Sequence, residues 1–329
     1  MKKQILKKKL LCLFAVLIIG TGCLAHAEDV NVCFYMIGGD LEHDSGAGSA
    51  DILEILRSKA PENVHIFLLT GGADDWRIPE LSGGTSFSVL RKQEEERFEL
   101  DETEIWEDCE ITEGETLKRF LDKSAEAVPG AETMLVLWGH GGMGVSGIGD
   151  AYGHMLTLNE IRQALTGTKA RISVVGMDAC AMATLESGWL LADTAEILIA
   201  STGTEAVSGW PHQLWLPMVG SGAKKNVGQI AETIGRSLAR KTEGVSILTM
   251  DLSGFRERNK QMLLNLFLRI SFPGNRKLLS TLTETAEDDY LIGNWDEGSY
   301  EGAKDLKDIG EKYMQWMMNG NQKKEGISK

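Results

Sequence analysis

Residues 134–142 read MLVLWGHGG, and residues 172–180 read ISVVGMDAC. Each stretch is an apolar run with the length of a buried strand, and each ends on a reactive side chain, His140 in the first and Cys180 in the second. The carboxyl ends of parallel strands meet at one edge of a sheet, where ligands bind. We therefore expect a thiol and an imidazole to share a site there.

Strand-like and helix-like patterns alternate around these two runs, which predicts an α/β fold with a mostly parallel central sheet covered by helices on both faces. A hairpin is predicted at 83–105, at the edge of the sheet. Further strands are expected at 30–37, 64–69, 196–200 and 245–250, and helices at 49–57, 115–127, 158–165, 182–193 and 226–240. Charged residues increase after Arg256, so we divide the chain into an N-terminal segment at 1–27, a main domain at 28–255, and a helical C-terminal extension or subdomain at 256–329.

The N-terminus resembles a secretory signal peptide. Five lysines among residues 2–9 precede an apolar stretch at 10–19 that is too short for a stable membrane-spanning helix. Ala25-His26-Ala27 fits cleavage after Ala27, and Cys23 offers an alternative lipoprotein site that would anchor the protein at the cell envelope. We predict an extracytoplasmic protein, secreted or periplasmic, that contacts a membrane only if Cys23 is lipidated.

The charge of the chain excludes nucleic acid as a partner. The formal net charge is −14, and removal of residues 1–27 takes away five lysines and no acids, which makes it −19. Phosphate binding requires the opposite sign. Cleavage also leaves three cysteines, Cys33, Cys109 and Cys180, and an odd number in an exported protein indicates a free thiol.

The pair His140 and Cys180 suits nucleophilic catalysis. A thiolate attacks a carbonyl, and a nearby imidazole serves first as base and then as acid toward the leaving amine. We expect the helix predicted to begin near Met182 to favour the thiolate through its unpaired N–H groups. The glycines beside His140 allow a substrate carbonyl to approach backbone donors, so the amides of Gly141 and Cys180 are the predicted oxyanion donors.

Two other kinds of site fit the sequence less well. Residues 142–147 match G-x-G-x-x-G, but no helix pattern begins until about Leu158, which disfavours a dinucleotide-binding loop. His140, His154 and His212 lack the spacing of a zinc site, so no metal ligand is predicted. Each catalytic candidate could also have a purely structural role, since a lone Cys or His in a strand is usually a packing residue.

With these residues assembled, the chain resembles the clostripain-like cysteine peptidases of the caspase, legumain and gingipain group. The likeness rests on the two opening motifs and on segments 35–42 (YMIGGDLE), 51–54 (DILE), 178–183 (DACAMA), 200–205 (ASTGTE) and 209–211 (GWP). It implies a caspase-like fold and an endopeptidase that cleaves after Arg or Lys, with Cys180 as nucleophile, His140 as acid and base, and Asp178 as the acidic floor of the substrate pocket. No cofactor is expected; calcium is suggested only by some relatives.

Two features depart from that family pattern. Residues 141–161 contain no Lys or Arg at which the chain could cut itself after His140, and the first candidates are Arg162, Lys169 and Arg171. Residues 206–208 (AVS) stand where relatives tend to carry a Pro-Gly turn. These departures leave open a second function, in which an altered family member acts as an extracellular binding module. A third function, transfer rather than hydrolysis, would use the same two catalytic residues and is not separable from hydrolysis by sequence.

Overall fold

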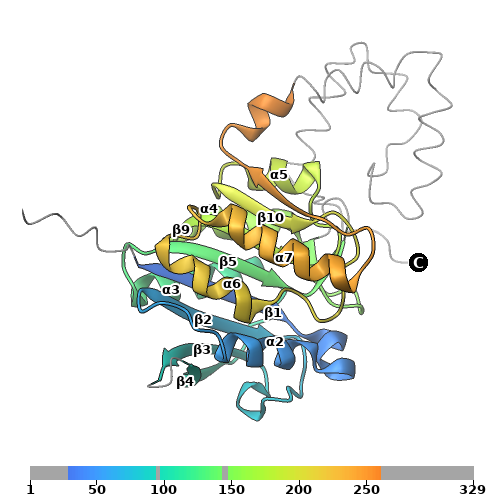
Figure 1. Ribbon diagram of the computed structural model, residues 1–329. Coiled ribbons are helices and arrows are strands. Elements are labelled where there is room, and N and C mark those ends of the chain that lie inside the picture. Colours follow the sequence, from blue (N-terminus) through green and yellow to red (C-terminus); the bar gives the residue numbers. More distant parts are fainter. Residues whose placement is uncertain (1–28, 94–96, 143–146, 261–329) are drawn as a thin grey trace, which may run out of the picture.

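The computed structural model describes residues 29–93, 97–142 and 147–260 (Figure 1). Within these ranges, eight strands form one sheet in the order β11-β10-β9-β5-β1-β2-β3-β4. The strands are β1 (Val30–Ile37), β2 (Val64–Gly71), β3 (Thr85–Lys92), β4 (Phe98–Trp106), β5 (Glu132–Trp138), β9 (Arg171–Asp178), β10 (Ile197–Ser201) and β11 (Ile247–Asp251). The pairings among β1, β2, β5, β9 and β10 are parallel, which confirms the predicted sheet.

Antiparallel strands close both edges of the sheet. β3 and β4 pair with each other as the predicted hairpin, and β3 joins β2. β11 pairs antiparallel with β10 at the opposite edge, in the place where a strand is predicted without a direction. The central strands β5 and β9, which carry the opening motifs, are neighbours, and Trp138 stands opposite Asp178 in their register.

Helices cover both faces of the sheet, as predicted (Figure 1). One face carries α2 (Ala47–Leu56), α6 (His212–Trp215) and α7 (Val227–Lys241), and the other carries α3 (Gly114–Ala127), α4 (Leu158–Gly167) and α5 (Leu185–Leu191). Three short helical turns complete the connections: η1 (Leu41–Ser45), η2 (Pro79–Leu81) and η3 (Leu216–Ser221). This arrangement creates two separate hydrophobic cores, one on each face.

The alternation of side chains along each strand divides the apolar residues between these cores. In β1, Phe34 and Met36 belong to the core under α2, α6 and α7, whereas Tyr35 and Ile37 belong to the core under α3, α4 and α5. Burying one such side chain stabilises the fold by about 1.5–3 kcal/mol. Because strands in the middle of this sheet are buried on both faces, their sequences are continuous apolar runs rather than alternating ones.

A second, small sheet begins at His140. Its strands are β6 (His140–Gly142), β7 (Gly147–Gly149) and β8 (Met155–Leu156), in the order β6-β7-β8. Gly142 and Gly147, the described ends of the G-x-G-x-x-G match, pair with each other across β6 and β7. The motif therefore joins two strands rather than a strand and a helix, which is not the geometry of a dinucleotide-binding loop.

One helix prediction was wrong in its start. The helix expected over 182–193 begins only at Leu185, capped by Thr184, whose Oγ1 accepts the amide of Ser187. The preceding segment pairs instead with the chain after β10, since Ala181 and Ala183 donate to the carbonyls of Gly203 and Ser201. Predictions for residues 1–27 and for the chain beyond residue 260 lie outside the described residues. Among the residues described, no helix is long and apolar enough to cross a bilayer.

Candidate active site

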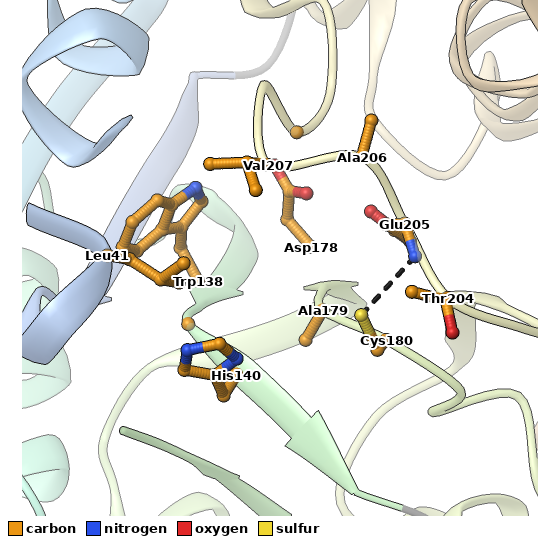
Figure 2. Close-up of a pocket in the computed structure, with 12 residues that line it drawn as sticks. Leu41, Trp138, His140, Asp178, Ala179, Cys180, Thr204, Glu205, Ala206 and Val207 are labelled. Atoms are coloured by element: carbon orange, nitrogen blue, oxygen red, sulfur yellow. Dashed lines mark hydrogen bonds between the residues drawn. The ribbon is translucent and has the colours of Figure 1, made fainter. Parts of the chain in front are cut away.

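A pocket opens at the carboxyl ends of β5 and β9 (Figure 2). Its volume is about 240 Å³, which is below the roughly 300–1,000 Å³ of a typical small-molecule site and suits a single amino-acid side chain. The lining residues are Leu41, Trp138, Gly139, His140, Asp178, Ala179, Cys180, Thr204, Glu205, Ala206, Val207 and Gly209. The predicted His140, Cys180 and Asp178 are thus brought together in one concave site.

His140 stands on the first residue of β6, directly after β5. The ring is partly exposed, and its Nε2 lies 2.9 Å from Oδ2 of Asp40, in the turn after β1. The other oxygen of Asp40, Oδ1, accepts the amide of Ala151 at 2.9 Å. Partial burial works to raise the pKa of Asp40, but the hydrogen bonds from Ala151 and His140 outweigh it and hold that pKa below its ordinary value.

Gly141 brings the main chain of the His140 strand against that of Cys180. A Cβ atom on Gly141 would lie 2.2 Å from the carbonyl oxygen of Cys180 and 2.8 Å from its nitrogen. No residue with a side chain fits at this position without moving one of the two segments. The glycine is therefore what allows the base and the thiol to share the pocket.

The Cys180 thiol has a hydrogen-bond donor, but not the one that the sequence predicts. The amide of Glu205 donates to Sγ at 3.3 Å, drawn as the dashed line in Figure 2. The expected donor was a helix start near Met182, and that helix begins too late and is capped by its own Thr184. A donor aimed at the sulfur stabilises negative charge there, so the loop after β10 takes the role assigned to the helix.

The turn around Cys180 is held by an unusual backbone conformation. Ala181 has φ +53°, in the left-handed region that side-chain-bearing residues rarely adopt. Such a conformation costs on the order of 1 kcal/mol and persists only where neighbours fix it. Here the amide of Ala181 donates to the carbonyl of Gly203, which ties the turn at Cys180 to the same loop that supplies the Glu205 amide.

Asp178 lies at the inner end of the pocket, among buried polar groups. Its Oδ2 accepts the amide of Trp210 at 3.1 Å. The same oxygen lies 3.3 Å from Nε2 of His212, a contact too poorly aligned to count as a hydrogen bond and better described as an ion pair. Asp51 completes the group: its Oδ2 accepts the indole N–H of Trp138 at 2.7 Å and lies 4.0 Å from His212 Nε2.

Burial and mutual contact shift the titration of this group. Burial works to lower the pKa of His212, but its contact with Asp178 and the charge of Asp51 outweigh this and raise the pKa above its ordinary value. Burial raises the pKa of Asp51 to about 8, against the opposing effect of His212. The carboxyl groups beneath the pocket thus favour the charged form of the His212 ring.

Glu205 adds a second carboxyl group to the pocket wall. Its side chain is buried, its Oε1 is 3.4 Å from the indole nitrogen of Trp210, and its Oε2 has no hydrogen-bond partner among the described residues. Burial, followed by the nearby Asp178 carboxylate, raises the pKa of Glu205 to about 10. A carboxyl group with this pKa keeps its proton at neutral pH.

One set of described side chains has donor atoms close enough to hold a metal ion, namely Asp51, Asp178 and His212, all within 4.8 Å of one another. However, Oδ2 of Asp51 and Oδ2 of Asp178 already accept N–H groups from Trp138 and Trp210. The donor set thus fits a network of charges better than a cation.

Comparison with known protein families identifies the chain. A family model described as the Clostripain family matches residues 35–325. The chain belongs to the clostripain family. It is therefore a cysteine peptidase and a hydrolase, as the sequence motifs indicated. The match continues beyond residue 255 into the segment that the sequence marks as an extension, and the domain division at that residue stays a prediction. No curated protein matches the chain.

Solved structures show the same fold for this clostripain-family chain. A secreted cysteine protease from Bacteroides thetaiotaomicron, in complex with an irreversible peptide inhibitor, superposes with a TM-score of 0.58 at 18% identity, over 74% of this chain and 70% of that one. An inactive zymogen protease from Parabacteroides distasonis gives a TM-score of 0.59 at 17% identity, over 88% of this chain and 81% of that one. The predicted caspase-like architecture is confirmed.

In this clostripain-family peptidase, the wall of the pocket at 204–209 is held from several sides. The amide of Gly209 donates to Ala206, and the ammonium group of Lys241, at the end of α7, donates to the carbonyls of Ser208 and Gly209. Trp210 fills the space above Gly176, where a Cβ atom would lie 2.9 Å from its ring. Val207, in the segment that departs from the family pattern, is 57% exposed at the rim.

Sequence reasoning missed two residues of the site. Asp40 stands 100 residues before His140; it belongs to the quoted segment 35–42, but no sequence pattern indicates that its carboxylate meets the imidazole. Its position after β1, the neighbour of β5, was a usable signal, because these parallel strands end at the same edge of the sheet. Glu205 belongs to the quoted segment 200–205, but no sequence pattern indicates that its amide meets the thiol.

Proposed function

We propose that this clostripain-family peptidase is an endopeptidase that cleaves after Arg or Lys through a dyad of Cys180 and His140, with Asp178 at the floor of the pocket. The observation that carries the proposal is the single pocket lined by a thiol, an imidazole and two carboxyl groups. Within that lining, His140 is the one residue that can carry a positive charge, so the pocket favours a cationic side chain.

The reaction divides into two steps. His140 accepts the proton of Cys180, and the thiolate attacks the substrate carbonyl. As the C–N bond breaks, the imidazolium gives its proton to the leaving amine, and a thioester remains on Cys180. Water, deprotonated by His140, then attacks the thioester. The acid is released, and the proton returns to the thiol.

The developing oxyanion would be stabilised by the amides of Gly141 and Cys180. The support for this assignment is their closeness: the main chains of the two residues meet so tightly that a Cβ atom on Gly141 would lie 2.8 Å from the Cys180 nitrogen. Preorganised amide donors in such a position contribute about 2.7–4 kcal/mol of transition-state stabilisation per donor.

The preference for Arg or Lys would come from Asp178 together with Glu205. One oxygen of Asp178 contacts His212 and the amide of Trp210, so this residue also stabilises the fold beneath the pocket. Glu205 presents a buried Oε2 that has no partner in the described part of the chain, which is a position where a guanidinium or ammonium donor would complete the hydrogen bonding. A cation in the pocket also favours loss of the Glu205 proton, and two carboxylates then face one positive charge.

Export and cleavage after Ala27 remain part of the proposal. The lysine-rich start, the short apolar stretch and the Ala25-His26-Ala27 motif support it. A solved structure with this fold is that of a secreted protease. Lipidation at Cys23 is the alternative, and mass spectrometry of the mature N-terminus distinguishes the two.

The experiment that tests the proposed function uses purified mature protein and a positional-scanning library of reporter peptides. We expect cleavage after Arg and Lys and loss of cleavage in Cys180→Ala. Cys109→Ala is the matched control, because Cys109 is the other described thiol that is not fully buried, and this variant should retain activity. Hydrolysis that persists in Cys180→Ala rejects the mechanism, and cleavage without a basic preference rejects the pocket assignment.

A further inference from the structure

We infer that Asp40 is a positioning residue for His140. Its carboxylate holds the imidazole in the tautomer and orientation in which the ring can accept the proton of Cys180. This inference rests on the proposed function, because it assigns His140 the role of acid and base. The observation that carries it is the 2.9 Å contact between Asp40 Oδ2 and His140 Nε2. A carboxylate only accepts hydrogen bonds, so the proton of a neutral imidazole is held on Nε2.

The position of the other ring nitrogen follows from this contact. In Figure 2 the His140 ring has one nitrogen on the side of Cys180 and one on the side of Leu41, the residue after Asp40. Nε2 is the nitrogen that meets Asp40, so Nδ1 is the one that faces the thiol side of the pocket. Asp40 thus keeps the lone pair of Nδ1 available to accept the thiol proton, and its charge stabilises the imidazolium that forms.

The turn that carries Asp40 is anchored at several points, of which the contact with Ala151 is one. The amide of Ala151 occupies the second oxygen of Asp40. Gly39, with φ +45°, packs so closely on the 150–154 turn that a Cβ atom there would lie 2.4 Å from Cβ of Asp150. Two residues after Asp40, the buried carboxylate of Glu42 accepts the amides of Ser49 and Arg77, which pins the turn to α2 and to the segment before η2.

The other carboxyl groups near His140 are engaged elsewhere. Asp150 accepts the amides of Tyr152 and His154 and contacts the ring of His154 at 2.8 Å. Asp178 and Glu205 lie on the opposite wall of the pocket with Trp210 and, for Asp178, His212. Among the described residues, Asp40 is the carboxylate whose hydrogen bond reaches the His140 ring.

The alternative is that Asp40 only anchors the turn after β1 to the amide of Ala151. A matched control variant separates this anchoring role from the positioning of His140. Ala151 is the second residue of a turn in which Gly153 donates to Asp150, a position that accepts proline. Ala151→Pro therefore removes the N–H that binds Oδ1 and keeps the carboxylate on His140. Asp40→Asn removes the negative charge and keeps the size of the side chain.

The experiment has two readouts, both in a Cys109→Ala background. In peptide hydrolysis we expect Asp40→Asn to lower kcat on the order of 100-fold, with KM and the melting temperature little changed, and Ala151→Pro to stay within a few-fold of wild type. In alkylation of Cys180 by iodoacetamide, we expect the midpoint of the pH profile to move upward in Asp40→Asn, as in His140→Ala, because the imidazolium that stabilises the thiolate loses its carboxylate.

Each outcome decides the matter. An alkylation profile of Asp40→Asn that coincides with wild type overturns the inference, as does an equal loss of kcat in Ala151→Pro, which would make Asp40 a tether of the loop. If no variant hydrolyses peptides but the alkylation midpoint still moves, the proposed function fails and the role of Asp40 stands. The two hypotheses are therefore tested separately.

Discussion

Two pairs of aspartate and histidine lie within the same site, and they differ mainly in burial. In the pair at the mouth of the pocket, the side chain of His140 is 36% exposed and that of Asp40 is 18% exposed. In the pair beneath the pocket, the side chains of His212 and Asp178 are 0% and 2% exposed. The first pair can exchange protons with a substrate, whereas the second is sealed among aromatic rings, with Phe34 and Trp215 against His212.

The comparison shows how the surroundings of one chemical pair decide what it does. A half-exposed imidazole can gain and lose a proton in each turnover, which acid–base chemistry requires. A fully buried imidazole that pairs with a carboxylate has no such access to protons, and removal of either partner leaves the other without compensation in a medium of low polarity. We therefore propose that the outer pair, Asp40 and His140, takes part in catalysis. The inner pair, Asp178 and His212, would set the shape and charge of the pocket.

The largest expected effect is the loss of activity when the imidazole of the outer pair is removed. His140→Ala removes the base and the acid together, so kcat/KM should fall by roughly 10³- to 10⁴-fold. The melting temperature should change little, because the ring is exposed on one side and contacts the fold through Asp40. Steady-state kinetics and a thermal melt check this. A variant with activity within tenfold of wild type would remove His140 from the mechanism.

The same substitution in the inner pair should act on stability instead. His212→Ala removes the partner of the buried Asp178 and opens a cavity beside Phe34 and Trp215, so the free energy of unfolding should fall by about 3–5 kcal/mol. Denaturant unfolding measures this loss. His154→Ala is the matched control: that ring also pairs with a buried aspartate but is 69% exposed, and we expect a loss below about 1 kcal/mol. Equal losses in the two variants would contradict the account.

A third variant separates the outer pair from its thiol without touching either residue. Gly141→Ala places a Cβ atom where the carbonyl oxygen of Cys180 lies, so one of the two segments must move by about an ångström. A displacement of this size should lower kcat on the order of 100-fold. Gly228→Ala is the control, since this exposed glycine of α7 has an ordinary backbone conformation and nothing lies within 4 Å of the place that its Cβ atom would take. Kinetics of both variants, normalised by active-site titration, provide the measurement.

The smallest expected effect is a pH dependence of the free energy of unfolding that comes from Glu205, the neighbour of Asp178. The pKa of Glu205 is raised from 4.5 in the unfolded chain to about 10 in the folded protein. Between these values the folded state binds the extra proton, so stability falls as pH rises. Glu205→Gln removes this titration, and its stability relative to wild type should improve by about 1–3 kcal/mol between pH 5 and pH 7. Chemical denaturation of both proteins at pH 5 and pH 7 measures the difference between their free energies of unfolding. A difference that does not change with pH would show that Glu205 is ionised in the folded protein.

Much of the fold and half of the site follow from the sequence. The two apolar runs that end on His140 and Cys180 are long, uninterrupted and flanked by helical patterns, and parallel strands must bring such ends together. Asp178 is part of the same signal, because the alternation along β9 places it on the same face as Gly176 and the ring of Trp210.

The rest depends on contacts that have no local pattern. Asp40 meets His140 across 100 residues of sequence, and the amide of Glu205 reaches Cys180 only because the loop after β10 folds back over the nucleophile. The helix after Cys180 is predicted too early because apolar periodicity continues through a segment that is in fact a turn followed by irregular chain. Thr184, with Ser187 three residues later, is the cap that periodicity alone overlooks.

The central claim is that Cys180, activated by His140, attacks substrates whose basic side chain occupies the pocket. Labelling with an acyloxymethyl ketone that carries Arg next to the reactive carbon, followed by peptide mapping, tests this most directly. We predict stoichiometric modification of Cys180, much slower modification in His140→Ala, and little reaction with the analogue that carries Glu. Modification of another cysteine, or equal labelling of Cys180 by the two analogues, would contradict the account.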